Sequence, residues 1–256
     1  NGTSGYEEAA AQGLVAAINA VRSMRGKEPV VLKRSEAYTG VLIDDLVTKG
    51  TEEPYRMFTS RAEHRLLLRQ DNADRRVMQY GYENGLVSEE QYRTMQEKYH
   101  RIDGVIEDFS SATITVDDEL KKTIEERGGS TASIPGKVQA GKLLKRPEIA
   151  ISDLKRMVDV DIPAESIPVI EMEIKYEGYI KKDLEKIRKI EKMENRKIPA
   201  EMDYDDITGL KNEAREKLKR IQPGTLGQAM RISGVDPSDI SIIVVHLESL
   251  DRKNRR

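Results

Sequence analysis

The spacing of apolar residues is the feature that most constrains this chain, because from Asp74 onward they recur every three or four positions. That spacing collects them on one face of an α-helix, whereas a half-buried strand would show strict alternation. We therefore predict a mainly α, multi-helical fold, with a few short strands confined to about residues 30–58 and 165–176. The expected core positions near the end of the chain are Leu210, Leu218, Ile240, Val244 and Leu247.

Composition limits the fold and the chemistry. Hydrophobic residues are 38% of the 256 and charged residues 34%, so small helical units with much solvated surface suit the chain better than one deep core. The chain has no cysteine, which excludes disulfides, thiolate metal sites and thiol nucleophiles within it. No apolar run approaches the ~20 residues of a membrane span, so we expect no membrane insertion. The formal net charge of −2 means that any nucleic-acid-binding surface must be local.

Capping residues, glycines and prolines predict where the helices begin and end. Capping-box patterns begin at Ser4, Ser60 and Ser88, and Asp236 is expected to cap the last helix with Pro237 at its first position. The expected helices cover 4–25, a stretch from about 71 to 81 or 85, 88–109, 117–128, 137–145, 152–158, 180–197, 210–221, 225–232 and the tail from Pro237. Boundaries are expected near 70–75 and near 177.

The N-terminal segment is the first candidate site. Gly2 and Gly5 lie just before the expected helix at 4–25. Free backbone N–H groups and the helix dipole favour an anionic or electron-rich group at such a place. The alternative is an ordinary capped helix with no ligand.

An arginine-rich stretch is the second candidate site. Guanidinium groups suit phosphates, and if residues 61–69 are helical, three arginines at four-residue spacing share a face. The alternative is a solvated face whose arginines pair with Glu63, Asp71 and Asp74. The expected helix at 180–197, with eight Lys/Arg against four Asp/Glu, is a weaker candidate. The stretch holds Arg56, Arg61, Arg65, Arg69, Arg75 and Arg76.

No complete active site is visible, and we expect no catalytic residue in this chain. The three histidines lack metal-ligand spacing, and the sequence has no GxGxxG, Walker or GxSxG motif. Asp44 and Asp45 would point to opposite faces of a strand. Residues 228–247 resemble a helix-turn-helix, but the would-be recognition helix begins with Asp236 and Asp239, which would face DNA phosphates, so DNA binding is not expected.

Four blocks of the sequence resemble the GidA/MnmG family, the tRNA uridine 5-carboxymethylaminomethyl modification enzymes. They are NGTSGYEEAAAQGL at 1–14, residues 37–63 with DDLVTKG and YRMFTSRAE, KYEGY at 175–179, and LGQAMRISGV at 226–235. The resemblance spans the whole chain. It implies that residues 1–72 close an FAD-binding domain of Rossmann type, that 73–177 form a helical linker domain, and that 178–256 form a helical bundle.

The resemblance also implies ligands and partners. The family consists of cytoplasmic, homodimeric flavoproteins that use FAD and NADH and act on the wobble uridine with an MnmE-family GTPase. The family's glycine-rich FAD loop precedes the part that resembles this chain, so we expect a C-terminal fragment with no bound cofactor of its own. The expected contacts with FAD are Asn1, Gly2, Thr3, Gly5 and Tyr6, and those with the tRNA anticodon loop are Arg56, Arg61, Arg65 and Arg69.

We therefore expect a part that binds tRNA and docks the GTPase. The alternative is a helical protein-interaction scaffold that does not contact RNA. The sequence departs from the family pattern at two positions. His64 stands where the motif has tyrosine, and Lys211 stands where relatives often place a serine cap, a loss of ~1 kcal/mol unless Thr208 or Asn212 caps the helix.

Overall fold

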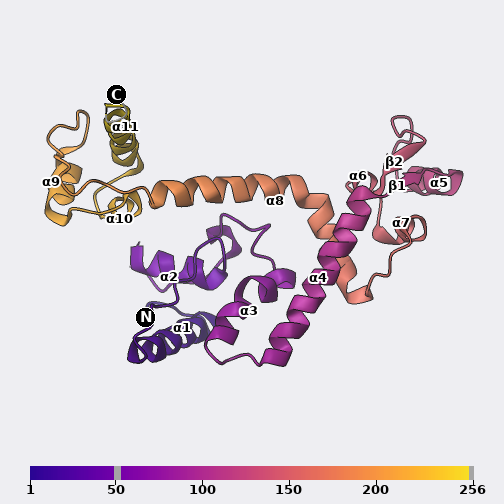
Figure 1. Cartoon of the computed structure of the whole chain (residues 1–256), viewed down its shortest axis with the longest axis horizontal. Helices are drawn as coiled ribbons and strands as arrows, with labels where there is room; N and C mark the ends of the chain where they lie inside the picture. Colours follow the sequence, from indigo (N-terminus) through magenta and orange to yellow (C-terminus); the bar gives the residue numbers. More distant parts are fainter. Residues whose placement is uncertain (49–52, 254–256) are drawn as a thin grey trace. The chain divides into compact units, whose positions relative to one another are not determined.

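The structure, a computed structural model, describes residues 1–48 and 53–253. Lys49 and Gly50, which end the DDLVTKG segment of the block at 37–63, lie outside the described residues. The described part confirms the mainly α class and divides into two compact units, residues 1–183 and 184–256 (Figure 1). No described helix is long and apolar enough to cross a membrane.

The first unit begins with α1 (Tyr6–Met24) and α2 (Tyr38–Thr48) and continues through a series of helices. These are the 3₁₀ turns η1 (Thr59–Arg61) and η2 (Gln70–Asn72), then α3 (Ala73–Glu83), α4 (Glu89–Ser111), α5 (Asp118–Glu126), α6 (Ala140–Leu144), α7 (Ile151–Val158), the 3₁₀ turn η3 (Ala164–Ser166) and α8 (Ile167–Glu194), of which residues up to 183 belong here. A two-stranded antiparallel sheet, β1 (Thr113–Thr115) and β2 (Lys137–Gln139), pairs Ile114 with Val138.

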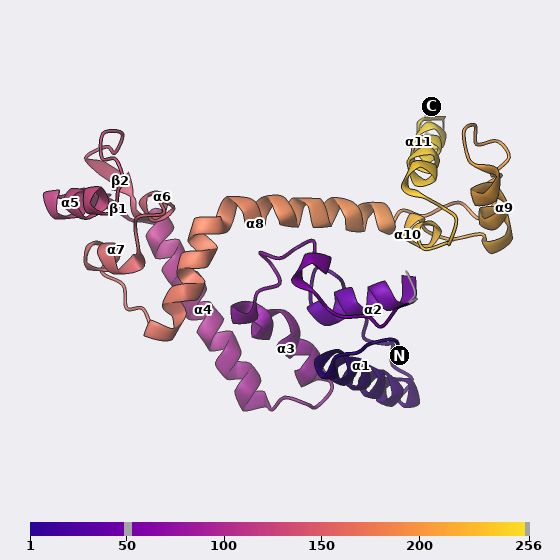
Figure 2. The ribbon, with the colours of Figure 1, turned by 180° about the vertical axis from the view of Figure 1, so that it is seen from behind.

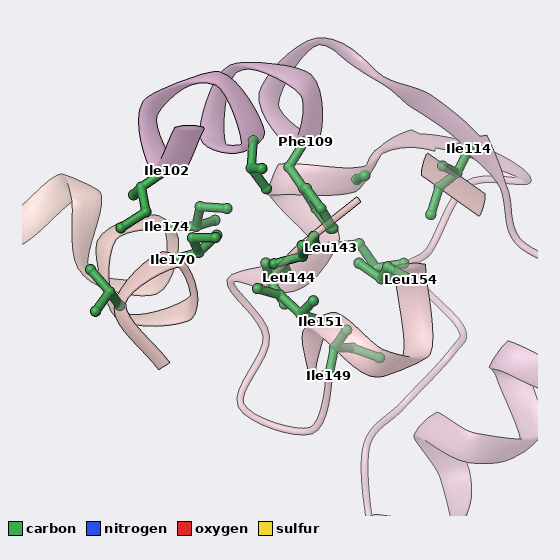
Figure 3. Close-up of a cluster of buried hydrophobic side chains, with 14 of the residues drawn as sticks. Ile102, Phe109, Ile114, Leu143, Leu144, Ile149, Ile151, Leu154, Ile170 and Ile174 are labelled. Carbon is green, nitrogen blue, oxygen red and sulfur yellow. The ribbon is translucent and has the colours of Figure 1, made fainter. Parts of the chain in front are cut away.

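The main core of this unit forms around α4, whose buried residues recur at three- and four-residue spacing. Ser88 caps α4 with the expected capping box, in which its side chain accepts from the backbone N–H of Gln91. Phe109 is fully buried, and Figure 3 shows its ring directed toward the side chains of α6 and α7. The labelled cluster is Ile102, Phe109, Ile114, Leu143, Leu144, Ile149, Ile151, Leu154, Ile170 and Ile174.

The expected strand regions were wrong. Residues 38–48 form α2 instead of a strand. The backbone of Val30 bonds a side chain instead of a neighbouring strand: the amide of Asn19 donates to the carbonyl of Val30 (3.0 Å) and accepts from its N–H (2.7 Å). Residues 167–176 belong to α8, because Val169, Ile170 and Ile174 bury one helical face. The sheet lies elsewhere, and β2 takes the start of the expected helix at 137–145.

Two expected capping boxes are also absent. The N-cap of α1 is Gly5 with no side-chain cap. Ser4 instead donates from its backbone N–H to the carbonyl of Tyr55, at 3.1 Å. Arg61 ends η1 and residues 62–69 form turns and bends instead of a helix, so the arginines there do not share a helical face.

The second unit contains the end of α8 followed by α9 (Asn212–Ile221), α10 (Leu226–Met230) and α11 (Pro237–Lys253). The expected core positions Leu210, Leu218, Ile240 and Leu247 are buried, and Val244 is partly buried against them. Thr225 caps α10, as expected, by accepting from the N–H of Gln228 (3.2 Å).

Lys211 leaves α9 without a side-chain cap, and neither Thr208 nor Asn212 replaces it. Lys211 instead connects the starts of two helices. Its backbone N–H donates to the buried carboxylate of Asp239 (3.3 Å), and its ammonium pairs with Asp236. The acidic residues that begin α11 are therefore engaged within the unit, and the ammonium of Lys211 holds the pKa of Asp236 well below its usual range.

Candidate RNA and cofactor interface

The N-terminal segment is bonded directly to the start of the arginine-rich stretch. Thr3 and Tyr55 form a parallel bridge, in which the N–H of Tyr55 donates to the carbonyl of Gly2 (2.6 Å) and the N–H of Ser4 donates to the carbonyl of Tyr55 (3.1 Å). The N–H of Met57 donates to the carboxylate of Glu8 (2.9 Å). Both neighbours of Arg56 are therefore fixed to the first eight residues.

The start of α1 is partly open to a ligand, since Gly5 is buried and the carboxylate of Glu8 lies over it. Its N-cap Gly5 offers no side-chain acceptor, so the N–H groups of Tyr6 and Glu7 have neither an intrahelical partner nor a cap from Gly5, whereas the N–H of Glu8 bonds the carboxylate of Glu8 itself. Asn1 and Gly2 are exposed, and Tyr6 is 94% exposed. Thr3 accepts a hydrogen bond from Gln12 (3.0 Å). Free N–H groups at a helix start with an exposed aromatic ring beside them fit an electron-rich cofactor atom.

A buried carboxylate, that of Asp45, binds the hydroxyl of Tyr55. Asp45, 1% exposed, accepts from the hydroxyl of Tyr55 (2.8 Å) and from the guanidinium of Arg34 (2.7 Å). Arg34 also pairs with Glu63 (2.6 Å). Burial, followed by the hydrogen bond to Asp45, raises the pKa of Tyr55 to about 12. The phenol therefore remains a hydrogen-bond donor at neutral pH.

Arg56 and Arg61 differ in what surrounds them. Arg61 donates from Nε to the carbonyl of Arg56 (2.9 Å), and its guanidinium lies 4.3 Å above the ring of Tyr55, an arrangement that favours a fixed side chain. The side chain of Arg56 is 57% exposed, with Nε 3.7 Å from the carboxylate of Glu8. Arg61 thus holds the loop while Arg56 projects from it.

Arg65 and Arg69 differ in the same way. Arg69 is 11% exposed and contacts Glu173 of α8 (2.5 Å), Asp71 (2.9 Å) and the carbonyl of Leu66 (2.6 Å). Arg65 is exposed and makes no side-chain hydrogen bond or ion pair within residues 1–48 and 53–253. Of the pairings with Glu63, Asp71 and Asp74 that the sequence allowed for these four arginines, only Arg69 with Asp71 forms.

The sequence missed the residues that support the site. Asp44 and Asp45, expected on opposite faces of a strand, lie in α2 and both bond Arg34 (3.0 and 2.7 Å). The sequence shows the two adjacent aspartates, but it does not show that their partner is Arg34, which lies in the loop before α2. His64 lies with Nδ1 3.3 Å from Asp183 of α8. No group of three or more potential metal ligands occurs in the described part of the chain.

Comparison with known proteins places this geometry in a family. Family models match residues 186–256 ("tRNA modifying enzyme MnmG/GidA C-terminal helical bundle"), 89–184 ("tRNA modifying enzyme MnmG/GidA C-terminal helical domain") and 1–28 ("Glucose inhibited division protein A"). The chain is similar to the tRNA uridine 5-carboxymethylaminomethyl modification enzyme MnmG of Caldicellulosiruptor saccharolyticus, at 50% identity over all of this chain and 41% of that protein. It is also similar to MnmG of Bacillus licheniformis, at 51% identity over 97% of this chain and 40% of that protein.

A solved structure of a family member has a similar fold. Aquifex aeolicus GidA in its form II crystal superimposes with a TM-score of 0.74 at 42% identity, over 96% of this chain and 38% of that one. The chain therefore spans about two fifths of the length of the relatives it matches. Matches to the family's C-terminal helical models, the identity across the chain and the shared fold agree: the chain belongs to the MnmG/GidA family.

Proposed function

We propose that this chain is the tRNA-contacting and GTPase-docking part of a flavin-dependent enzyme that adds a carboxymethylaminomethyl group at carbon 5 of the wobble uridine, with an MnmE-family GTPase as partner. The observation that carries the proposal is the bonding of Tyr55 to Gly2 and Ser4. Because Arg56 follows Tyr55 in the chain, these bonds hold Arg56 close to residues 1–6, the segment that we expect to contact the cofactor. A phosphate-binding cation beside a cofactor is what a base-modifying enzyme needs to hold its substrate.

The N-terminal segment fits the FAD that the proposal requires. Gly5 gives the N–H groups of Tyr6 and Glu7 at the start of α1 no side-chain cap, and Asn1, Gly2 and Tyr6 are exposed around them. Together with Thr3, these residues would hold part of FAD, which supplies the redox chemistry and is reduced by NADH. Because the chain has no glycine-rich phosphate loop, we expect it to bind no FAD alone, and an absorbance spectrum of the purified chain checks this.

The side-chain contacts of the four arginines narrow the proposed phosphate contacts to Arg56 and Arg65. Their guanidinium groups face solvent, whereas Arg61 and Arg69 are held by Tyr55 and Glu173. Within the proposal, the first two bind phosphate and the other two position the loop. The unit at 184–256 would dock the GTPase, and its exposed apolar side chains include Val245 at 66% and Ile221 at 49%.

Charge reversal tests the RNA role on this chain. Arg56→Glu and Arg65→Glu should weaken binding of an anticodon stem–loop RNA and lower the salt dependence of log K by about 0.7–0.9 for each lost phosphate contact. Arg101→Glu is the matched control, because Arg101 is exposed on α4 and unpaired within the described residues. Arg69→Glu should lower the melting temperature. Unchanged RNA affinity and salt dependence in both Arg56→Glu and Arg65→Glu would favour the scaffold without RNA contact.

A further inference from the structure

A row of side chains on α8 presents two aromatic rings to solvent. Glu173, Tyr176, Tyr179 and Lys182 follow one another at three-residue spacing, which places them along one inclined line on the helix surface. Tyr176 is 39% exposed and Tyr179 65%. Their ring centroids lie 6.2 Å apart at an interplanar angle of 49°. Gly178, which lies between them in the sequence, has open space where a side chain would be, so no side chain at this position covers the rings.

The row lies next to the arginine-bearing segment. Arg69 Nη2 contacts Glu173 Oε1 at 2.5 Å, and His64 Nδ1 lies 3.3 Å from Asp183 Oδ2. Both views of the ribbon show the connection between α2 and α3 rising to the side of α8 (Figures 1 and 2). Arg65 lies between His64 and Arg69 in the sequence. Their partners on α8, Asp183 and Glu173, lie on either side of Tyr176 and Tyr179 along the helix. Arg65 and the two rings therefore lie between the same two contacts.

The charges of this surface suit a nucleic acid. The carboxylate of Glu173 is neutralised by Arg69, and that of Glu177 by Lys145 (2.5 Å). Lys182 and Arg65 are exposed and form no ion pair with any described residue. Exposed aromatic rings beside unpaired cations are how proteins bind unpaired bases and their phosphates. A protein partner would not require the unpaired cations.

We propose that Tyr176 and Tyr179 form a stacking platform for unpaired bases of the RNA whose phosphates Arg56 and Arg65 bind; this inference rests on the proposed function. Lys182 extends the cationic edge of the platform along α8. The aromatic rings supply contacts that a fully paired RNA cannot use, because its bases are already stacked. The chain would thereby select RNA with an open loop.

The test compares two RNAs on the chain described here. One is an anticodon stem–loop, and the other is a fully paired RNA with the same number of phosphates. Tyr176→Ala/Tyr179→Ala should reduce stem–loop affinity by about 5- to 150-fold per stacked base, with the salt slope and the affinity for paired RNA unchanged. Tyr176→Phe/Tyr179→Phe should keep stem–loop affinity within about 3-fold, because the ring faces remain. Tyr82→Ala is the control, since Tyr82 on α3 is about as exposed as Tyr176 but its ring already stacks on that of Tyr92.

The outcomes separate the inference from the proposed function. If the wild-type chain binds the stem–loop and the double alanine variant binds it equally well, the platform is wrong while the phosphate contacts stand. An equal loss on both RNAs would also overturn stacking. If the wild-type chain binds neither RNA, both the proposed function and the inference fail. Tyr179→Ala alone, which removes the more exposed ring, guards against misfolding of the double variant.

Discussion

The carboxylate of Glu8, in the first turn of α1, accepts a hydrogen bond from the backbone N–H of Met57 at 2.9 Å, across 49 positions of the sequence. Glu8 is only 7% exposed, and this bond is the main reason that its pKa lies below the ordinary value, followed by a bond from its own N–H. A first-turn acid is also favoured by the helix dipole. One side chain thus connects the expected cofactor end of α1 with the loop that carries Arg56.

Removing this carboxylate should loosen the loop. We expect Glu8→Ala to lower the melting temperature, because the N–H of Met57 loses its acceptor. Glu8→Gln, which can still accept that bond, should lower it less. Glu7→Ala is the control, since Glu7 lies in the same turn but is exposed. A melting temperature that is equal in Glu8→Ala and Glu7→Ala would contradict the role of this bond.

Glu8 should also make the stability of the chain depend on pH. Because the folded-state pKa of Glu8 is depressed, its contribution is complete above the unfolded value, near pH 4.3, and is lost as the pH falls through the folded-state pKa. Thermal unfolding from pH 7 down to about pH 3 should therefore show a shallower acid loss in Glu8→Gln than in wild type. Parallel curves for the two proteins would rule this out.

The contact between Arg69 and Glu173 should stabilise the position of the arginine-rich segment against α8. The arginine is 11% exposed and the glutamate 26%, so removing one partner leaves a largely buried charge unpaired. We expect Arg69→Ala to cost roughly 2–3 kcal/mol in the free energy of unfolding, below the 3–5 kcal/mol of fully buried pairs. A double-mutant cycle with Glu173→Ala measures the coupling, and additive effects would exclude a direct interaction.

Local signals predicted most of the fold, and non-local contacts explain what they missed. The caps of α4 and α10 and the buried faces of α9 and α11 follow from residues within one or two turns of each other. The three-residue strands β1 and β2 are too short to show alternation, and their partners lie 22–26 positions apart. In the site, side-chain contacts distinguish the arginines, and they depend on a partner such as Glu173, 104 positions away from Arg69.

The bundle core of the second unit gives a direct stability test. Leu218 is fully buried among the residues of α9, α10 and α11. Leu218→Ala should cost roughly 2–5 kcal/mol, from lost burial and the cavity left behind. Hydrogen exchange should report faster opening of 198–250, whereas Val245→Ala, at a position 66% exposed, should cost below about 0.5 kcal/mol. Equal exchange in Leu218→Ala and wild type would rule out this packing.

Gly5 should be essential to the Glu8 contact for a reason of space. Its φ of −94° is open to any residue, so backbone strain is not the constraint. A Cβ at this position would lie 1.6 Å from Glu8 Oε2. Gly5→Ala must therefore displace the carboxylate from Met57, and we expect it to lower the melting temperature in the wild-type background. In a Glu8→Ala background the obstacle is gone, so the same substitution should have almost no effect there. A double-mutant cycle on melting temperature checks this non-additivity. Equal losses from Gly5→Ala in both backgrounds would show that something other than the Glu8 carboxylate requires the glycine.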